Sequence, residues 1–361
     1  MSPAAPELGV TKAAQSQRIE HLDGWRGLAI ISVLIGHFLP VPYVNWGHLG
    51  VELFFVLSGR LMSHILFVQN VPLGVFFRRR IARIYPALLV FVAATFLPAL
   101  YSVTLLGTKR PLADLVDATA AVTFCTNYVE AIFTRGSIYT HTWSLAVEEH
   151  SYVLLALVAF CSKRDRKIAL QVTVALAAVC MVNGIFNSWA LGLADYQVYW
   201  RTDVRAASIL ISASIYLLLP QFGRIPAYAA ILAAIAGILS FSNFLSGYIN
   251  YTAGTIMLAI AVNTIDYSPR LVRQFLASRV FVWFGVLSYS IYLWQEPFYA
   301  GVAKLAQLNS FIPAILICAA LCCAAISYTF IERPMRVFLN ARWRTFNPFK
   351  RSKDDISLQS T

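Results

Sequence analysis

Apolar residues run along almost the whole chain in long blocks, and short polar segments separate these blocks. A helix needs about 20 apolar residues to cross the hydrocarbon core of a membrane. By this criterion the pattern predicts spanning helices at residues 25–41, 49–68, 84–105, 145–162, 167–190, 206–220, 226–244, 248–264, 281–301 and 311–330. The predicted fold class is therefore an all-α membrane protein, a polytopic bundle of about ten transmembrane helices.

One further apolar stretch, at 114–133, is predicted to lie at the outer surface or to re-enter the membrane without crossing it. It contains polar and acidic residues at four positions: Asp114, Asp117, Asn127 and Glu130. The predicted organisation is a transmembrane domain over 21–335, between an N-terminal tail at 1–20 and a basic C-terminal tail at 336–361. The N-terminal tail lacks the apolar core and cleavage site of a secretory signal peptide.

The charged residues predict the orientation of the bundle, because lysine and arginine stay on the cytoplasmic side. Most of the 29 lysines and arginines fall in segments that lie inside when the N-terminus is inside. This bias predicts an even number of spans and both termini in the cytoplasm. The expected location is the inner (cytoplasmic) membrane. The bias also accounts for the net charge of +12. The predicted partner of the basic tail is thus the lipid bilayer and not a nucleic acid.

The first span, "LDGWRGLAIISVLIGHF", carries two ionisable residues, Arg26 and His37. A helix turns about 100° and rises about 1.5 Å per residue, so the two lie on nearly the same face and roughly 16 Å apart. Such groups are costly in a bilayer and tend to mark a pathway or a site. Histidine can take a proton from a hydroxyl group. The alternative is a packing histidine bonded to a backbone carbonyl.

Arginines gather in "FFRRRIARIYP", at the inner end of the third predicted span. Arg80 and Arg83 are three residues apart and share a helix face. Guanidinium groups bind phosphates with two hydrogen bonds at once, so the cluster suits a phosphorylated ligand. A plain cytoplasmic anchor would explain the same arginines.

Two other polar segments sit at span ends. "THTWSLAVEEH" places Trp143, Ser144 and Glu148 at the outer end of the fourth span, and "YWRTDVRAAS" places Asp203 and Arg205 at the start of the sixth. An aromatic belt would explain the tryptophan, and an interfacial ion pair would explain the second segment. A carboxylate in the first turn of a helix is favoured by the helix dipole.

Together with "GHLGVELFFVLSGRLM", "SYSIYLWQEPF" and "FIERPMR", these motifs resemble the acyltransferase 3 family of integral membrane proteins. That family includes O-acetyltransferases of O-antigens and exopolysaccharides and acyltransferases of nodulation factors. The motifs run through most of the chain in the family's order. The resemblance implies ten spanning helices, acyl-CoA (acetyl-CoA) bound from the cytoplasmic side as donor, and a sugar hydroxyl as acceptor.

The resemblance also suggests roles for single residues. His37 is expected to act as general base, Arg26 to steer the donor or stabilise negative charge, and Glu148 to orient or charge-balance the histidine. The phosphates of the donor are assigned to Arg80, Arg83 and Arg78. Substrate contacts are predicted for the polar residues of the two span-end segments, Trp143, Ser144, Asp203 and Arg205. No metal site is expected.

Three positions depart from the family's pattern. Glu52 stands where the family often has aspartate, and Arg60 replaces a usual apolar residue, so that it either contacts an anionic group or snorkels. Gln295 stands where relatives often have histidine, and no proton transfer is assigned to it. With no hydrolase-like extension after residue 361, the short form of the family is expected.

The predicted function is a membrane-bound O-acyltransferase that moves an acyl group, acetyl in the first instance, from acyl-CoA to a carbohydrate hydroxyl. A transporter or flippase that uses the charged stripe is the first alternative. A membrane haem protein with His37 and His141 or His64 as ligands is the second. It is disfavoured because the predicted topology places no two histidines at a matching depth.

Overall fold

The computed structural model describes residues 19–39, 41–106, 111–134, 136–305, 309 and 311–345. Most of the predicted tails, residues 1–18 and 346–361, lie outside the described residues. The α-helices are α1 (Glu20–Phe38), α2 (Trp46–Ser63), α3 (Leu73–Leu106), α4 (Pro111–Val122), α5 (Thr126–Phe133), α6 (Trp143–Cys161), α7 (Arg166–Ile185), α8 (Asp195–Tyr199), α9 (Thr202–Leu218), α10 (Ala229–Ser240), α11 (Gly247–Ile249), α12 (Thr255–Thr264), α13 (Arg270–Leu276), α14 (Arg279–Leu305), α15 (Ile312–Ser327) and α16 (Arg333–Thr345).

Short helical turns of other pitch extend or join these helices. They are η1 (His64–Val68), η2 (Thr140–Thr142), η3 (Phe186–Ala190), η4 (Leu219–Gln221), η5 (Asn250–Gly254), η6 (Ile265–Tyr267) and η7 (Tyr328–Glu332). Within the described ranges no strand forms, and a single antiparallel bridge joins Val44 to Ser242. The bridge ties the loop after α1 to the loop after α10.

Every predicted span overlaps a helix, but the count of about ten is not confirmed by length and apolar character. Six helical segments of the described residues are long and apolar enough to cross a membrane, and α13 with α14, bent by 50°, makes up to seven. The helices α10 and α12 have only 12 and 10 residues. Charged residues occupy the first two turns of α1, and α1 is not among these six segments. The stretch 114–133 divides between α4 and α5, both too short to span.

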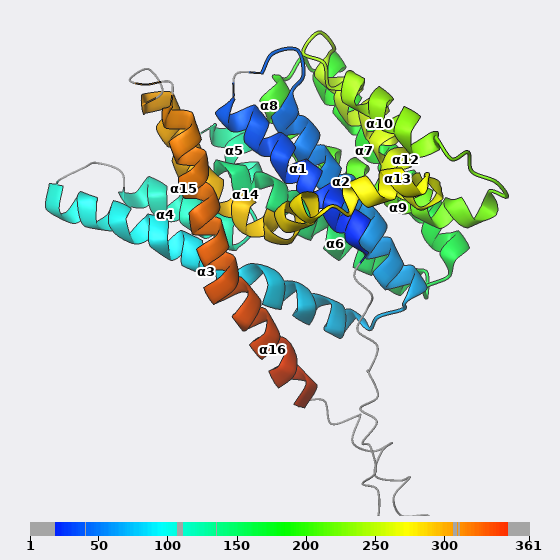
Figure 1. Cartoon of the computed structure of the whole chain (residues 1–361), viewed down its shortest axis with the longest axis horizontal. Helices are drawn as coiled ribbons and strands as arrows, with labels where there is room; N and C mark the ends of the chain where they lie inside the picture. The colour runs from blue at the N-terminus through cyan, green and yellow to red at the C-terminus, as the bar shows by residue number, and fades with distance from the viewer. Residues whose placement is uncertain are drawn as a thin grey trace, which may run out of the picture.

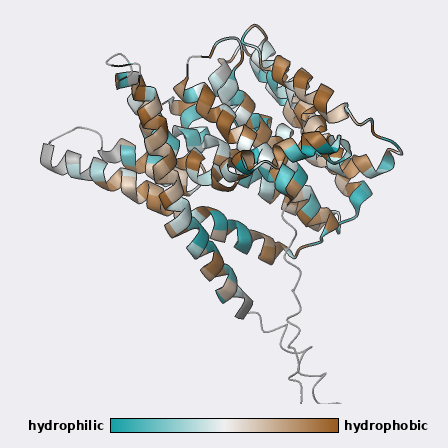
Figure 2. Cartoon of the chain, in the orientation of Figure 1, coloured by the Kyte–Doolittle hydropathy of each residue, from teal (hydrophilic) through white to brown (hydrophobic). Residues whose placement is uncertain are grey.

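Figure 1 shows how the helices are grouped: α3, α4, α15 and α16 lie on one side, α7, α9, α10 and α12 on the other, and α1, α2 and α14 between them. Figure 2 shows that α15 is almost wholly hydrophobic, whereas hydrophilic residues gather on α16 and at the start of α3. These two hydrophilic segments belong to helices that pack against each other. The molecule is a multi-pass membrane protein whose polar groups are concentrated inside the bundle and at helix ends.

The closest helix contact is between α1 and α14, and glycines make it possible. A Cβ on Gly27 would lie 2.0 Å from the carbonyl oxygen of Phe281, and one on Gly285 would lie 1.9 Å from that of Asp23. Without a hydrophobic force between helices in lipid, small residues that let backbones approach are the usual basis of packing. The start of α1 thus meets the start of α14, and His37 near its end meets Gln295. The two helices therefore run in the same direction.

We expect Gly285→Ala to destabilise the protein by about 1–3 kcal/mol, because the added methyl group cannot fit without moving α1 away from α14. Thermal unfolding in detergent measures this change. The matched control is Gly74→Ala in α3, since no atom of the described residues lies within 4 Å of a Cβ built there. Equal melting temperatures for the two variants would contradict the assigned role of the glycine contact.

Candidate active site

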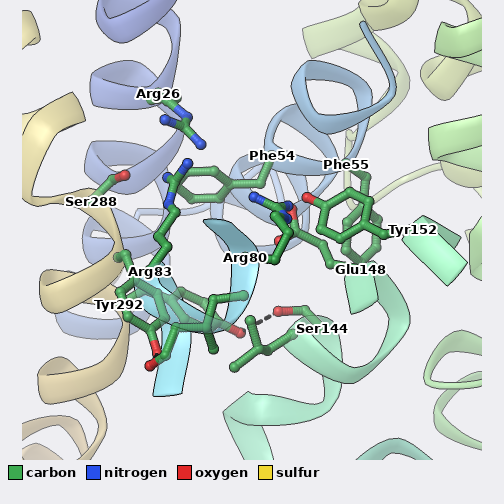
Figure 3. Close-up of a pocket in the computed structure, with 13 residues that line it drawn as sticks. Arg26, Phe54, Phe55, Arg80, Arg83, Ser144, Glu148, Tyr152, Ser288 and Tyr292 are labelled. Carbon is green, nitrogen blue, oxygen red and sulfur yellow. Dashed lines mark hydrogen bonds between the residues drawn. The ribbon is translucent and has the colours of Figure 1, made fainter. Parts of the chain in front are cut away.

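Three arginines from two helices meet in a pocket between the helices of the bundle, which we call the arginine cavity (Figure 3). Its volume is about 70 Å³. It is lined from α1, α2, α3, α6 and α14 by Arg26, Phe54, Phe55, Arg80, Arg83, Ile84, Ser144, Leu145, Glu148, Tyr152, Ser288, Tyr289 and Tyr292. The predicted pair Arg80 and Arg83 thus lies together with Arg26, although the chain separates them by more than fifty residues.

The charges in the arginine cavity are only partly balanced. Arg80 stacks its guanidinium group 3.8 Å above the ring of Tyr152 and lies 3.8 Å from the Glu149 carboxylate. Glu148 accepts a hydrogen bond of 2.6 Å from Ser58. In Figure 3 the side chains of Arg26 and Arg83 point toward each other. Like charges that face each other in a low-dielectric interior favour an anion between them, and phosphate is the anion that arginine binds best.

A second pocket surrounds His37, and we call it the histidine cavity. Its volume is about 270 Å³. Among its lining residues are Val33, Gly36, His37, Asn45, Gly47, His48, Val51, Thr140, His141, Trp143, Tyr199, Trp200, Tyr292, Glu296 and Tyr299. Arg26 and His37 thus both face the interior of the bundle from α1, as the helical spacing predicts. They face two different cavities.

The contacts of His37 determine which ring nitrogen can act as a base. Its Nδ1 lies 2.7 Å from Oε1 of Gln295, and Nε2 of Gln295 donates to Glu296 over 3.0 Å. An amide oxygen only accepts hydrogen bonds, so Nδ1 of His37 carries the proton and donates. The lone pair of the neutral ring is then on Nε2. Tyr299 stacks on the imidazole with ring centres 4.4 Å apart and holds its orientation.

Position 47, beside this nitrogen, is a glycine, so no side chain from that position covers the ring. A Cβ on Gly47 would stand 3.8 Å from Nε2 of His37, in ordinary van der Waals contact. The glycine therefore leaves the basic edge of the ring accessible from the cavity. A hydroxyl group can approach the lone pair there without moving the backbone.

Tyr292 separates the two cavities and lines both of them. Its hydroxyl group lies 2.7 Å from the hydroxyl of Ser144 and donates to the backbone carbonyl of His141. The predicted substrate residues therefore divide at this wall. Trp143 faces the histidine cavity, and Ser144 faces the arginine cavity and holds Tyr292.

Other predicted site residues lie away from the positions expected for them. Arg78 is exposed and does not line the arginine cavity, because it points from a different face of α3 than Arg80. Glu148 lines the arginine cavity and not the histidine cavity, so it does not contact His37. Asp203 lies outside both cavities, where it pairs with Arg201 at 2.6 Å and accepts from Asn183 at 2.9 Å.

Arg205 is fully buried and forms an ion pair with Glu52, the residue that departs from the family's aspartate. Glu52 also accepts a hydrogen bond of 2.6 Å from Thr255. The guanidinium carbon lies 4.7 Å from the ring centre of Tyr199, a residue of the histidine cavity. Arg205 thus supports the cavity wall from behind and does not itself reach the cavity.

The second departure, Arg60, contacts an anionic group and does not snorkel. It is buried, pairs with Asp266, and donates to the carbonyl of Val262. His21 contacts the same carboxylate at 2.7 Å. Burial raises the pKa of Asp266, but the hydrogen bond from His21 and the charge of Arg60 outweigh it and lower the pKa to about 2. The carboxylate therefore stays ionised and joins α1, α2 and η6.

Sequence reasoning missed several residues of the histidine cavity. His48 and His141 line it together with His37, although the predicted topology did not bring these histidines together. Within the described residues, however, no three His, Cys, Asp or Glu side chains are arranged to hold a metal ion. The missed residues of α14 have a signal in the sequence. Tyr292, Glu296 and Tyr299 are spaced by four and three residues and so share one helix face.

The fold and the two cavities define a multi-pass membrane protein with an internal polar site, in which arginines line one cavity and histidines line the other. A family model described as an acyltransferase domain matches residues 19–332 of this chain. The chain belongs to this acyltransferase family, and the match confirms the resemblance seen in its motifs.

Curated relatives support the same assignment. The chain is 28% identical to the peptidoglycan O-acetyltransferase OatA of Listeria monocytogenes over 358 residues, which cover 88% of this chain and 56% of the relative. It is 29% identical to the O-acetyltransferase OatA of Staphylococcus aureus, with 87% and 57% covered. For the putative peptidoglycan O-acetyltransferase YrhL of Bacillus subtilis, identity is 27%, with 90% and 56% covered. The chain thus spans little more than half the length of these relatives. No solved structure matches it.

We expect loss of one partner of the buried pair Arg205–Glu52 to cost about 3–5 kcal/mol, because the other charge is left uncompensated. Arg205→Met should therefore lower the melting temperature strongly, and Glu52→Gln added to it should recover much of the loss. Arg201→Met at the more exposed pair with Asp203 should cost at most about 1 kcal/mol. If the double variant is no more stable than Arg205→Met alone, the pair is not the cause.

Proposed function

We propose that this protein is a membrane O-acyltransferase that transfers an acyl group, acetyl in the first instance, from acyl-CoA to a hydroxyl group of a cell-wall carbohydrate. The observation that carries the proposal is the open Nε2 edge of His37 in a cavity that adjoins an arginine cavity. The names of the relatives, two of which specify peptidoglycan, support acetyl as the group and a peptidoglycan-type glycan as the acceptor. The inner membrane is the proposed location, with both termini in the cytoplasm.

The donor side of the proposal rests on charge. Arg26, Arg80 and Arg83 bring three positive charges into the arginine cavity, whereas Glu148 is the one acidic residue among its described lining residues. Glu149 and Glu332 do not line the cavity but interact with the same arginines. The surplus at the cavity wall itself suits the phosphates of a coenzyme. The cavity holds only about 70 Å³, whereas sites for drug-sized ligands hold roughly 300–1,000 Å³. Entry of acyl-CoA therefore requires the lining side chains to move apart.

The chemical step follows from the tautomer of His37. Nε2 takes the proton from the acceptor hydroxyl as its oxygen attacks the thioester carbonyl carbon. The carbon–sulfur bond breaks, and the departing coenzyme thiolate takes the proton back from the imidazolium. Gln295 keeps Nδ1 as the donor throughout, so the ring stays in the productive orientation. Direct transfer of this kind is favoured over an acyl-histidine intermediate because a single proton shuttle completes it.

For the thioester to reach Nε2 from the arginine cavity, it has to pass Tyr292. Two hydrogen-bond partners, Ser144 and the His141 carbonyl, hold this side chain where it lines both cavities. Both partners belong to the segment "THTWSLAVEEH". That segment accordingly controls the wall between donor and acceptor, which gives Ser144 a positioning role.

We expect His37→Ala to lower acyl transfer by about 10²–10⁴-fold, because removal of a general base typically has an effect of that size. The measurement is the transfer of radiolabelled acetyl from acetyl-CoA to glycan by the purified protein in nanodiscs. Arg80→Ala should instead raise the KM for acetyl-CoA, whereas Arg79→Ala, at an exposed neighbouring position, should not. Full activity of His37→Ala in a folded protein would remove the base assignment.

Gly47→Ala should leave the fold intact and lower activity about tenfold or more, which corresponds to about 1.4 kcal/mol. The added methyl group makes only ordinary contacts, but it covers the approach to Nε2 of His37. The melting temperature and the KM for acetyl-CoA should stay unchanged, with the loss confined to transfer. Gly74→Ala provides the matched control for a glycine replaced within a helix. Undiminished transfer by Gly47→Ala would show that the hydroxyl does not approach from this side.

A further inference from the structure

A third cavity holds about 410 Å³ and shares lining residues with the histidine cavity but, among the described residues, none with the arginine cavity. We call it the amide–aromatic cavity after its lining, which comprises Asn45, His48, Tyr196, Tyr199, Trp200, Ser242, Asn243, Leu245, Gly247, Asn250 and Tyr251. None of these lining residues is acidic, and none is a lysine or an arginine. Its volume falls in the usual range of ligand sites, roughly 300–1,000 Å³.

This cavity shares part of its lining with the histidine cavity. Asn45, His48, Tyr199 and Trp200 line both. A ligand bound in the amide–aromatic cavity would therefore lie next to the cavity that contains His37. The bridge between Val44 and Ser242 fixes the rim, with a hydrogen bond of 2.9 Å from the Asn45 amide to the Phe241 carbonyl.

Tyr199 and Trp200 offer different groups to a ligand: Tyr199 offers its hydroxyl group, and Trp200 offers its ring. The ring of Tyr199 is covered on both sides, by His48 with ring centres 4.1 Å apart and by the guanidinium group of Arg205. Its hydroxyl group, however, is buried and has no hydrogen-bond partner within the described part of the chain. Trp200 is half-buried, packs against the core and lines the cavity, and its ring lies near that of Tyr196, with ring centres 5.9 Å apart and planes inclined by 51°.

Two amide side chains complete the set. The side-chain oxygen of Asn45 accepts from the backbone of His48 over 3.0 Å, which orients its NH₂ group as a donor for a ligand. Asn243 is exposed at the rim, and its backbone is held by a 2.8 Å hydrogen bond to the carbonyl of Tyr43. Together with the Tyr199 hydroxyl, these groups offer donors and acceptors around one flat indole.

This chemistry discriminates between ligand classes. An anion would lose its hydration without gaining a cation, since Arg205 is already neutralised by Glu52. An alkyl chain would leave the amides and the tyrosine hydroxyl unpaired, which is unfavourable for each buried polar group. A neutral, polyhydroxylated ring satisfies the polar groups with its hydroxyls and covers the indole with its apolar face.

We propose that the amide–aromatic cavity binds an uncharged sugar ring of the acceptor, with Trp200 as the stacking platform and the Tyr199 hydroxyl and the Asn45 and Asn243 side chains as hydrogen-bonding groups. The proposal rests on the proposed function for its statement that this sugar is the acceptor. The binding of a neutral sugar stands on the cavity alone. It assigns acceptor recognition to residues that are not adjacent to the arginine cavity.

The test uses the full chain in nanodiscs with a neutral N-acetylglucosamine tetrasaccharide as the probe. Calorimetric titration should show binding that Trp200→Ala weakens by about tenfold, the equivalent of a lost stacking contact of about 1.4 kcal/mol. Trp200→Phe should retain most of the affinity, and Asn243→Ala should lose part of it. A sulfated tetrasaccharide should bind more weakly than the neutral one. Trp189→Ala is the matched control, because Trp189 is 83% exposed and lines none of the cavities described above.

Kinetics distinguish this proposal from the proposed function. Trp200→Ala should raise the KM for the tetrasaccharide while the KM for acetyl-CoA stays constant. If the wild-type protein binds the sugar in a Trp200-dependent manner but transfers no acetyl group, the proposed function fails and the sugar site stands. Three results would overturn the sugar site. The wild type fails to bind the sugar, or it binds the sulfated probe with equal affinity. The third is that Trp200→Ala and Asn243→Ala leave binding unchanged while their melting temperatures are also unchanged.

Discussion

The backbone contact between α1 and α14 is the constraint on which both cavities depend. In lipid, helices gain little from apolar side chains alone, and close approach of small residues is what holds them together. Here Gly27 and Gly285 let carbonyl groups of the opposite helix occupy the space of a side chain. With that spacing, Arg26 and Ser288 line one cavity, and His37, about 16 Å further along α1, contacts Gln295 of α14.

The cost of charge in a low-dielectric interior sorts the remaining ionisable groups into two kinds. Arg205 and Arg60 are each matched by a carboxylate, and these pairs join helices to one another. The guanidinium groups that line the arginine cavity are in surplus over the carboxylate there. A buried pair that is complete needs nothing more, whereas a surplus of one sign creates a binding site for the opposite sign. The same reasoning makes the uncharged cavity beyond His37 a poor place for an anion.

Tyr292 lies between two parts of the interior that differ in their chemistry. Arginines lie on one side of this ring, and an imidazole with amides and aromatic residues lies on the other. A donor that carries phosphates and an acceptor that carries hydroxyls would thus approach from opposite sides and meet at one wall. This arrangement fits the family to which the chain belongs, because groups suited to a phosphorylated donor and groups suited to a hydroxyl-bearing acceptor line two cavities that share Tyr292.

The sequence by itself determined the helices, their approximate limits, the family, and the fact that Arg26 and His37 share a face, since each follows from local periodicity or from motifs. It also predicted that Arg80 and Arg83 act together, because three residues is one helical turn. Only the tertiary structure decided which groups meet across helices. Glu148 faces arginines instead of His37, Gln295 proves to be the partner of that histidine, and Arg205 is a buried structural charge. These contacts join residues up to 258 positions apart, so they depend on how whole helices pack and leave no mark in any local pattern.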